Sequence, residues 1–155
     1  MNKRIKAAIA IATALAIPSE GLRQYAYRDP VGILTVCYGS TTDVQTGKKY
    51  SLEECKARLD ADMLKAIESV ERCAPGLPEK TLAAFADAVY NMGPTIVCNT
   101  QKSTAARLLK TGDIKAACHQ LPRWNKANVA GVMVSLPGLT KRRAAEKKLC
   151  LEGLE

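Results

Sequence analysis

The sequence predicts a single α+β domain that is mostly helical, with a small β lobe and a larger helical lobe joined by a long helix. Three observations support this prediction. The chain of 155 residues is long enough for one folding unit with a real core, and it is rich in Ala, which favours helices. Strand and turn signals concentrate in residues 24–50. Beyond them, apolar residues recur mostly at helical spacing.

The chain opens with a basic and then an apolar stretch. Residues 1–6 carry three cations, and residues 7–17 have no charge and only Thr13 as a polar side chain. This pattern resembles a secretory signal, but it is shorter than the roughly 20 residues of a permanent membrane span. Three interpretations compete: cleavage after Ala16, a plain core helix, or an uncleaved segment that inserts weakly and later leaves the membrane.

The third interpretation is favoured. Cleavage would leave Glu20 three residues from a flexible terminus, which is a poor position for a catalytic group. A surface helix of a soluble protein should show a polar stripe, and this run has almost none.

Three polar side chains follow the apolar run. Glu20 comes shortly after it, Asp29 precedes a predicted tight turn at residues 30–32, and Thr35 lies on a predicted strand at residues 33–38. In a hairpin, Thr35 lies back across from Asp29. A carboxyl at a helix end, a carboxyl at a turn and a hydroxyl on a strand could therefore meet on one wall of a cleft.

Cleavage of a glycosidic bond requires two carboxyl groups that face one substrate. One is protonated and donates to the leaving oxygen, and the other is ionised and activates water or stabilises the developing positive charge. Burial beside the apolar run would favour the neutral form of Glu20, and the polar turn beside Arg28 the charged form of Asp29. Taken as a pattern alone, two unrelated surface carboxylates are the alternative.

The chain from residue 40 onward is predicted to be a polar loop or third short strand, followed by helices. Ser51 and Glu54 form a capping box at the start of a helix that should reach about Arg72 and join the two lobes. Further helices are expected at residues 79–91, 100–110 and 113–121.

The C-terminal segment is harder to assign. Trp124 is expected to anchor the core rather than to form a platform for a sugar. Residues 125–137 mix Gly, Val and Asn and predict no single element. Thr140 is expected to cap a final helix that ends near Leu151.

The net charge of +8 suits a polyanionic partner such as nucleic acid, anionic lipid or a bacterial wall with free carboxylates. Nucleic acid is disfavoured because no stacking aromatics lie between the basic residues.

Zinc is disfavoured because the chain has no Cys-x-x-Cys pair and only one histidine. An even number of widely spaced cysteines fits disulfides in an oxidising compartment, with buried cytosolic thiols as the alternative. The six are Cys37, Cys55, Cys73, Cys98, Cys118 and Cys150.

One signature joins several of these residues. Glu20-x8-Asp29-x5-Thr35, with Glu-Gly-Leu-Arg at its head, Tyr-Arg-Asp at its middle and Thr-Val-Cys-Tyr-Gly at its tail, resembles the catalytic signature of the phage-type, T4-like lysozymes of glycoside hydrolase family 24. The resemblance spans about residues 18–152 and includes Gly-Leu-x-x-Arg-Arg-x-x-Glu at residues 138–146. The similarity is to the lambdoid branch that carries an N-terminal signal-arrest-release segment.

The resemblance implies a lysozyme-like fold and an endolysin that hydrolyses the β-1,4 bond between N-acetylmuramic acid and N-acetylglucosamine in peptidoglycan, causing host lysis. Glu20 would be the general acid, Asp29 would activate water or stabilise the transition state, and Thr35 would position the water. Arg142 or Arg143 would reach back to Glu20, and Asn91 lies in the family's turn near the site. No cofactor or metal is implied.

The resemblance also implies the pairs Cys73–Cys98, Cys37–Cys55 and Cys118–Cys150. Residues 1–17 would form the signal-arrest-release segment and residues 18–155 the catalytic domain. We expect a monomer that is exported uncleaved to the inner membrane, contacts it transiently through residues 7–17, and then works in the periplasm. Residues 1–36 contain no cysteine, which excludes control by thiol exchange from the anchor.

Two other functions remain open. A lytic transglycosylase would use Glu20 but would need neither Asp29 nor Thr35 to hold water. A non-catalytic cationic protein that acts on walls or membranes would depend on the charge and the apolar N-terminus. One departure from the family is Ser40, which stands where a His is frequent, so a buried ion pair to the following helix is expected to be missing.

Overall fold

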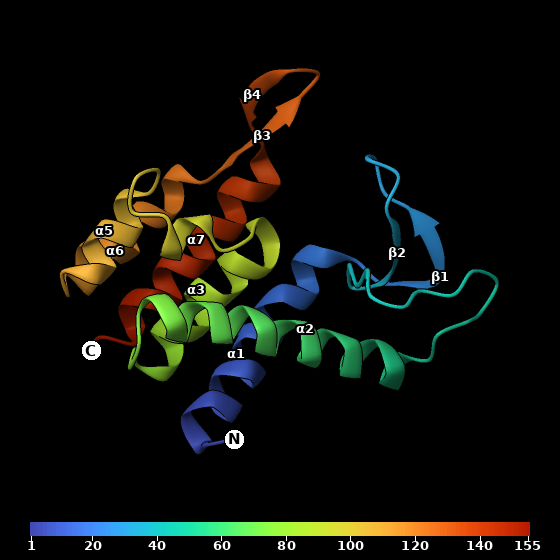
Figure 1. The fold of residues 1–155 in the computed structure, drawn as a ribbon, viewed down its shortest axis with the longest axis horizontal. Coiled ribbons are helices and arrows are strands. Elements are labelled where there is room, and N and C mark those ends of the chain that lie inside the picture. The colour runs from blue at the N-terminus through green and yellow to red at the C-terminus, as the bar shows by residue number, and fades with distance from the viewer.

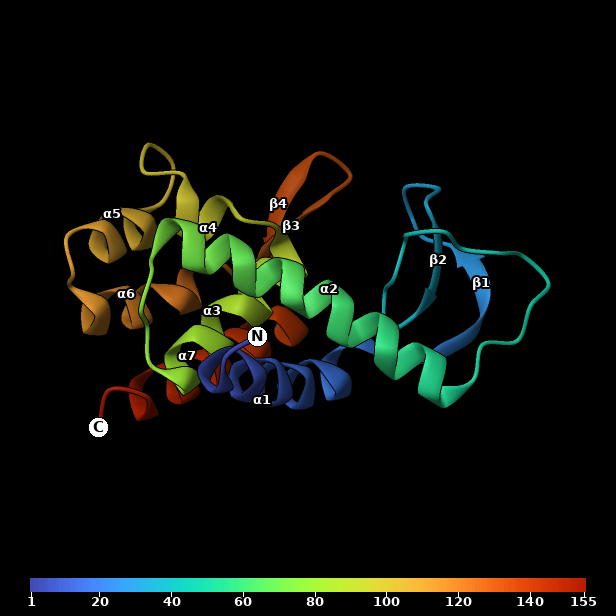
Figure 2. The same ribbon diagram turned by 60° about the horizontal axis from the view of Figure 1, so that its bottom comes forward.

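The computed structural model describes residues 1–155 and divides them between a small β lobe and a larger helical lobe (Figures 1 and 2). The helices are α1 (Lys3–Glu20), α2 (Leu52–Cys73), α3 (Glu79–Met92), α4 (Thr95–Cys98), α5 (Thr104–Lys110), α6 (Ile114–Gln120), the 3-10 turn η1 (Leu121–Arg123) and α7 (Pro137–Glu152). The strands are β1 (Arg23–Arg28), β2 (Leu34–Cys37), β3 (Lys126–Val129) and β4 (Val132–Ser135). The predicted α+β class is confirmed.

Helix α1 extends the predicted apolar run in both directions. The side chain of Asn2 caps it by accepting a hydrogen bond from the backbone N–H of Ile5. Ala8, Ala12 and Ala16 recur every four residues, so they share one face, and all three are fully buried in the main core. Their small side chains allow α1 to pack against α2 and α3. No helix in the structure combines the length and the apolar character that crossing a membrane would require.

The β lobe is an antiparallel hairpin with a small core of its own. Strands β1 and β2 pair with Tyr27 opposite Thr35, and the predicted strand at residues 33–38 is confirmed in shortened form. The loop that follows joins the sheet by two isolated bridges, Ser40 to Val36 and Lys49 to Tyr25. Ser40 accepts a hydrogen bond from Arg58 of α2 at 3.0 Å, so this position still contacts the following helix, but through a hydroxyl group.

Helix α2 runs from the β lobe into the helical lobe, as Figure 2 shows. The predicted capping box is confirmed: Ser51 Oγ accepts from the Glu54 N–H, and the Glu54 carboxylate accepts from the Ser51 N–H. Helix α3 lies at the centre of the helical lobe and packs against α1, α2 and α7. Trp124 packs against the main core, as predicted.

Two predictions for the C-terminal half are wrong, and one unassigned segment receives an assignment. The helix expected at residues 100–110 begins only at Thr104, because Asn99 folds the preceding residues into a turn and Ser103 caps α5. The hairpin β3–β4 occupies most of residues 125–137, for which the sequence predicted no single element. Thr140 does not cap α7, since Pro137, whose fixed φ suits the first helical position, starts that helix earlier. Thr140 Oγ1 instead accepts from Asn125 Nδ2.

All six cysteines form disulfides, in the three pairs that the resemblance implied. Cys37–Cys55 ties β2 to the first turn of α2, Cys73–Cys98 ties the end of α2 to α4, and Cys118–Cys150 ties α6 to α7. The linked residues are 18 to 32 positions apart, and closing loops of this size stabilises a fold by about 3 kcal/mol each.

Candidate active site

Glu20 lies at the junction of the two lobes. It is the last residue of α1, and the chain enters β1 directly after Gly21 and Leu22. Its side chain is 20% exposed and pairs with Arg142 Nη1 of α7 at 2.5 Å. The neighbour that dominates its surroundings is therefore a guanidinium group, and not the apolar side chains that the sequence suggested.

The second oxygen of Glu20 faces the turn after β2. A side chain carbon placed on Gly39 would lie 3.5 Å from Glu20 Oε2, and Gly39 has a φ of +93°, which favours glycine. The Tyr90 hydroxyl of α3 donates to the backbone carbonyl of Tyr38 in the same turn. The turn of the β lobe is thus held beside the carboxyl group of Glu20.

Asp29 closes the β1–β2 hairpin. Its Oδ1 accepts hydrogen bonds from the backbone N–H groups of Val31 at 3.0 Å and Ile33 at 2.8 Å, which confirms the predicted turn. Arg28 instead donates to the carbonyl of Gly32, so the backbone, and not Arg28, holds the carboxylate. The other oxygen, Oδ2, makes no hydrogen bond within the chain and can contact a water molecule or a sugar.

Thr35 is buried on β2, next to the strand position that pairs with the end of β1. Its Oγ1 donates to the carbonyl of Ile33 at 2.9 Å. Because the hydroxyl hydrogen is used in this way, the oxygen presents its lone pairs as acceptors. Thr35 and Asp29 therefore lie on one hairpin, while Glu20 comes from the helical lobe.

The sequence left open which arginine reaches Glu20, and the structure gives that contact to Arg142. Two further donors of the same guanidinium bind Asp87 of α3, Nε at 2.9 Å and Nη2 at 2.7 Å. Burial alone would raise the pKa of Asp87, but the hydrogen bonds from Arg142 and Glu146 outweigh it and hold the pKa below its usual range. All three donor nitrogens of Arg142 are thus paired with carboxylates.

Arg143 points to the other side of the same cluster. Its Nη2 donates to Asn91 Oδ1 and to Glu146 Oε2, both at 2.8 Å. Burial raises the pKa of Glu146 to about 10, with the hydrogen bond to Asp87 as the next contribution. Arg143 therefore fixes Asn91 at the edge of the site and does not touch Glu20.

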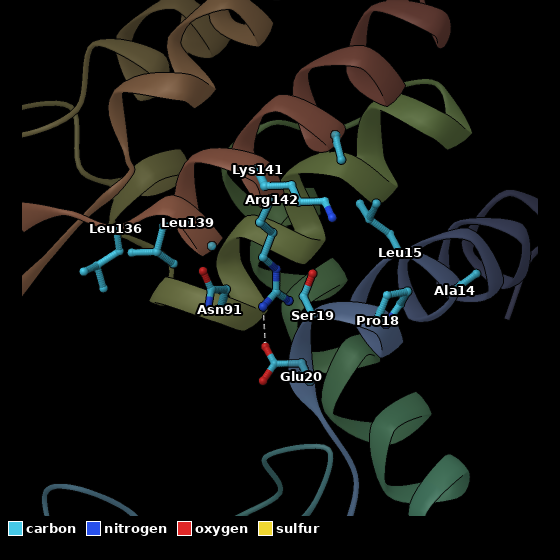
Figure 3. A pocket seen from close by; sticks show the side chains of 12 residues that line it. Ala14, Leu15, Pro18, Ser19, Glu20, Asn91, Leu136, Leu139, Lys141 and Arg142 are labelled. Atoms are coloured by element: carbon cyan, nitrogen blue, oxygen red, sulfur yellow. Dashed lines mark hydrogen bonds and ion pairs between the residues drawn. The ribbon is translucent and has the colours of Figure 1, made fainter.

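A pocket of about 690 Å³ opens beside Glu20, between the end of α1 and the start of α7. Figure 3 shows Arg142 reaching across it to Glu20, with Asn91 and Ser19 on either side. Leu139 and Lys141 line the α7 wall. No group of three or more His, Cys, Asp or Glu side chains is arranged to hold a metal ion.

Two residues of the site were missed or given no role by the sequence analysis. Asp87 is the single charged residue in the apolar centre of α3, and a lone carboxylate in such a run is a signal for a buried partner. Glu146 belongs to the C-terminal motif, but its contact with Asp87 depends on two helices packing together. Neither contact follows from local spacing.

A helical lobe, a β hairpin, one carboxyl group at their junction and a second in the turn of the hairpin are the arrangement of a glycoside hydrolase of the lysozyme type. The comparisons with known proteins agree. The family model described as phage lysozyme matches residues 18–146. A SAR-endolysin of bacteriophage PS119 is 40% identical over 86% of this chain and 77% of its own length.

Two solved structures are similar to this fold. The active form of the P1 phage endolysin has a TM-score of 0.81 at 24% identity, covering 94% of this chain and 85% of its own. The muramidase domain of SpmX from Asticaccaulis excentricus has a TM-score of 0.80 at 28% identity, covering 90% and 94%. The chain belongs to the phage lysozyme family. It is a muramidase of the endolysin kind, and its substrate is bacterial peptidoglycan.

Proposed function

We propose that this lysozyme hydrolyses the β-1,4 bond between N-acetylmuramic acid and N-acetylglucosamine with Glu20 as the general acid. The observation that carries the proposal is the asymmetric hold on Glu20. Oε1 is bound by Arg142, while Oε2 lies on the side of Gly39 in the β lobe. Oε2 is therefore the oxygen that carries the proton and donates it to the leaving group.

Asp29 and Thr35 prepare the attacking water. Asp29 Oδ1 is occupied by the turn, so Oδ2 accepts one hydrogen of the water or faces the developing positive charge. Thr35 Oγ1, whose own hydrogen is held by Ile33, accepts the other hydrogen. Attack on the face opposite to Glu20 inverts the anomeric centre and gives the α-anomer.

Glu20→Gln tests the assignment of the acid. Purified peptidoglycan is digested with the intact chain, with Glu20→Gln and with Glu53→Gln, an exposed glutamate of α2 with the same change of charge. We expect the loss of a general acid to reduce release of new reducing ends by about 10³-fold, with no loss in the control. Unchanged release by Glu20→Gln would contradict the assignment.

Mass analysis of the same products separates the alternatives. Hydrolysis gives ordinary reducing ends, whereas anhydro-muramoyl products would identify a lytic transglycosylase and remove the water-holding roles of Asp29 and Thr35. Lysis of cells by Glu20→Gln would instead assign the effect to the cationic, apolar character of the chain.

The N-terminal residues 1–17 act as a signal-arrest-release segment and residues 18–155 as the catalytic domain. The chain is exported, uncleaved, to the inner membrane of the host, and as a monomer it works in the periplasm. The buried residues of α1 are three alanines and Thr13, whose modest apolar surface makes insertion weak and reversible. While residues 7–17 lie in lipid, Glu20 cannot reach Arg142, so the enzyme is inactive.

The first residue of the exported protein shows whether residues 1–17 are kept as an anchor or removed as a cleaved signal. Mass spectrometry of the periplasmic protein should find the intact chain from Met1. Collapse of the membrane potential should move the protein from the membrane fraction to the soluble fraction. A periplasmic product that begins at Ile17 would contradict the proposal.

A further inference from the structure

The cluster of charges behind Glu20 has more members than ion pairing to the acid requires. Asp87, Arg143 and Glu146 are fully buried, and Arg142 is almost so. Burying a charge costs several kcal/mol unless it is paired, so such a cluster persists only where its members fix one another. Three of these residues do not touch the cleft, and they surround the one that touches Glu20.

The geometry of Arg142 depends on Asp87. The carboxylate binds Nε and Nη2 as a two-pronged pair, which fixes both the plane and the rotation of the guanidinium. Only Nη1 remains, and it donates to Glu20. We propose, on the basis of the function proposed above, that Asp87 is a positioning residue that aligns Arg142 and compensates its charge, so that Glu20 keeps the proton it donates.

The proton count of the cluster supports this role. Two guanidinium groups, of Arg142 and Arg143, face three carboxyl groups, of Glu20, Asp87 and Glu146. Burial raises the pKa of Glu146 to about 10, so at neutral pH it is protonated and donates to Asp87. Asp87 is then an anion that accepts hydrogen bonds from Glu146 on one side and from Arg142 on the other. Its negative charge offsets most of the positive charge of Arg142.

The charged and titratable groups around Glu20 come from three helices. Arg142 of α7 touches it, and Asp87 of α3 stands directly behind that guanidinium. Lys141 of α7 lines the same pocket as Glu20. Tyr90 of α3 lies on the Gly39 side, where Asp62 and Lys65 of α2 line a separate, smaller pocket. Of these groups, Arg142 alone makes an ion pair with Glu20, so Asp87, which lies behind Arg142, is the charge expected to act on Glu20 through it.

The test is the pH profile of kcat/KM for the intact chain and for Asp87→Asn. A neutral amide in place of the Asp87 carboxylate leaves the cation uncompensated, and an adjacent cation favours the carboxylate form of Glu20. The alkaline limb, on which Glu20 loses its proton, should move to lower pH by about one unit. Asp60→Asn, which removes a partly exposed carboxylate of α2, should leave the limb in place. A lower plateau for Asp87→Asn with an unmoved limb would overturn the proposal.

Two substitutions of Glu146 provide a second test of the proposal. Glu146→Gln keeps an N–H donor to Asp87, so its alkaline limb should stay at the wild-type position. Glu146→Leu removes the donor and leaves Asp87 with Arg142 alone, so its limb should move to higher pH because the anion is less satisfied and repels the Glu20 carboxylate more strongly. Identical limb positions for the two Glu146 variants would count against the proposal.

A measurement on the unaltered protein covers the case in which Asp87→Asn does not fold. Carboxyl carbons labelled with ¹³C are followed by NMR from acid to alkaline pH. The Glu146 signal should remain that of a protonated acid through neutral pH, and its ionisation in the ordinary acidic range would overturn the proposal. If the unaltered chain releases no reducing ends, the proposed function fails. If it is active and the limb does not move, this inference alone fails.

Discussion

The two lobes hold their parts of the active site by different means. The helical lobe packs 24 buried apolar residues into one cluster, while the β lobe packs four. Glu20 depends on the first, through α1, α3 and α7, and Asp29 and Thr35 depend on the second. The proposed acid is therefore fixed by a large core and buried charges, and the residues proposed to hold the water are fixed by a hairpin, a turn and one disulfide.

This difference means that damage to the two lobes should be distinguishable. A change in the helical lobe that disturbs Glu20 should also cost folding free energy, because the contacts of the acid are part of the core. A change in the β lobe should affect turnover more than global stability, since little of the core lies there.

The largest effect is expected from Arg142→Met. It removes the partner of Asp87 and leaves a buried carboxylate unpaired, which should destabilise the fold by about 3–5 kcal/mol as well as abolish most activity. Chemical denaturation of Arg142→Met and of Lys141→Met, an exposed neighbour on the same helix, measures the difference. Equal stability of the two variants would show that the buried pair does not support the helical lobe.

The disulfides compare the lobes directly. Cys37→Ala/Cys55→Ala and Cys118→Ala/Cys150→Ala should each lose about 3 kcal/mol, because loops of similar size are released. Only the first pair should lower kcat/KM at temperatures well below unfolding, since it holds the strand that carries Thr35. Thermal unfolding and activity assays separate the two quantities, and an equal loss of kcat/KM in both variants would remove the distinction between the lobes.

Packing of α1 should be sensitive to volume. Ala12→Leu places a larger side chain on the buried face of α1 and should destabilise the fold by about 2 kcal/mol. Ala10→Leu makes the same change on the exposed face and should be close to neutral. Thermal melts of both variants test this, and an equal shift would mean that α1 is not closely packed against α2 and α3.

The smallest effect is expected from Thr35→Val. The carbonyl of Ile33 still accepts from the Asp29 N–H, so the turn is kept while the hydroxyl that is proposed to hold the water is lost. We expect about a tenfold loss of kcat, or about 1.4 kcal/mol of barrier, and substantial recovery in Thr35→Ser. Steady-state kinetics on purified peptidoglycan decides this, and full activity of Thr35→Val would remove the residue from the mechanism.

Local signals in the sequence predicted local features of the fold well. The capping box at Ser51 and the turn after Asp29 each depend on residues close together in the chain. Thr140 was assigned wrongly because Pro137 offered a stronger start for α7. The β3–β4 hairpin was missed because its strands are four residues long and mostly exposed. They therefore lack the alternation of apolar and polar residues that identifies a half-buried strand.

The site divides in the same way. The motif placed Asp29 and Thr35 on one hairpin, where the pairing is local. The contact between Glu20 and Arg142 joins positions 122 apart, and Asp87 joins them from a third helix. Such contacts depend on how α1, α3 and α7 pack, so the sequence could offer Arg142 and Arg143 only as alternatives. The role of Asp87 required the structure.

The central claim is that water held by the β lobe completes the reaction that Glu20 begins. Hydrolysis of peptidoglycan in H₂¹⁸O, with immediate mass and anomer analysis of the products, tests it most directly. The account predicts one ¹⁸O atom at each new muramic acid reducing end, initially as the α-anomer. Anhydro-muramoyl products without ¹⁸O would contradict it, because the bond would then have been broken without the water that Asp29 and Thr35 are proposed to hold.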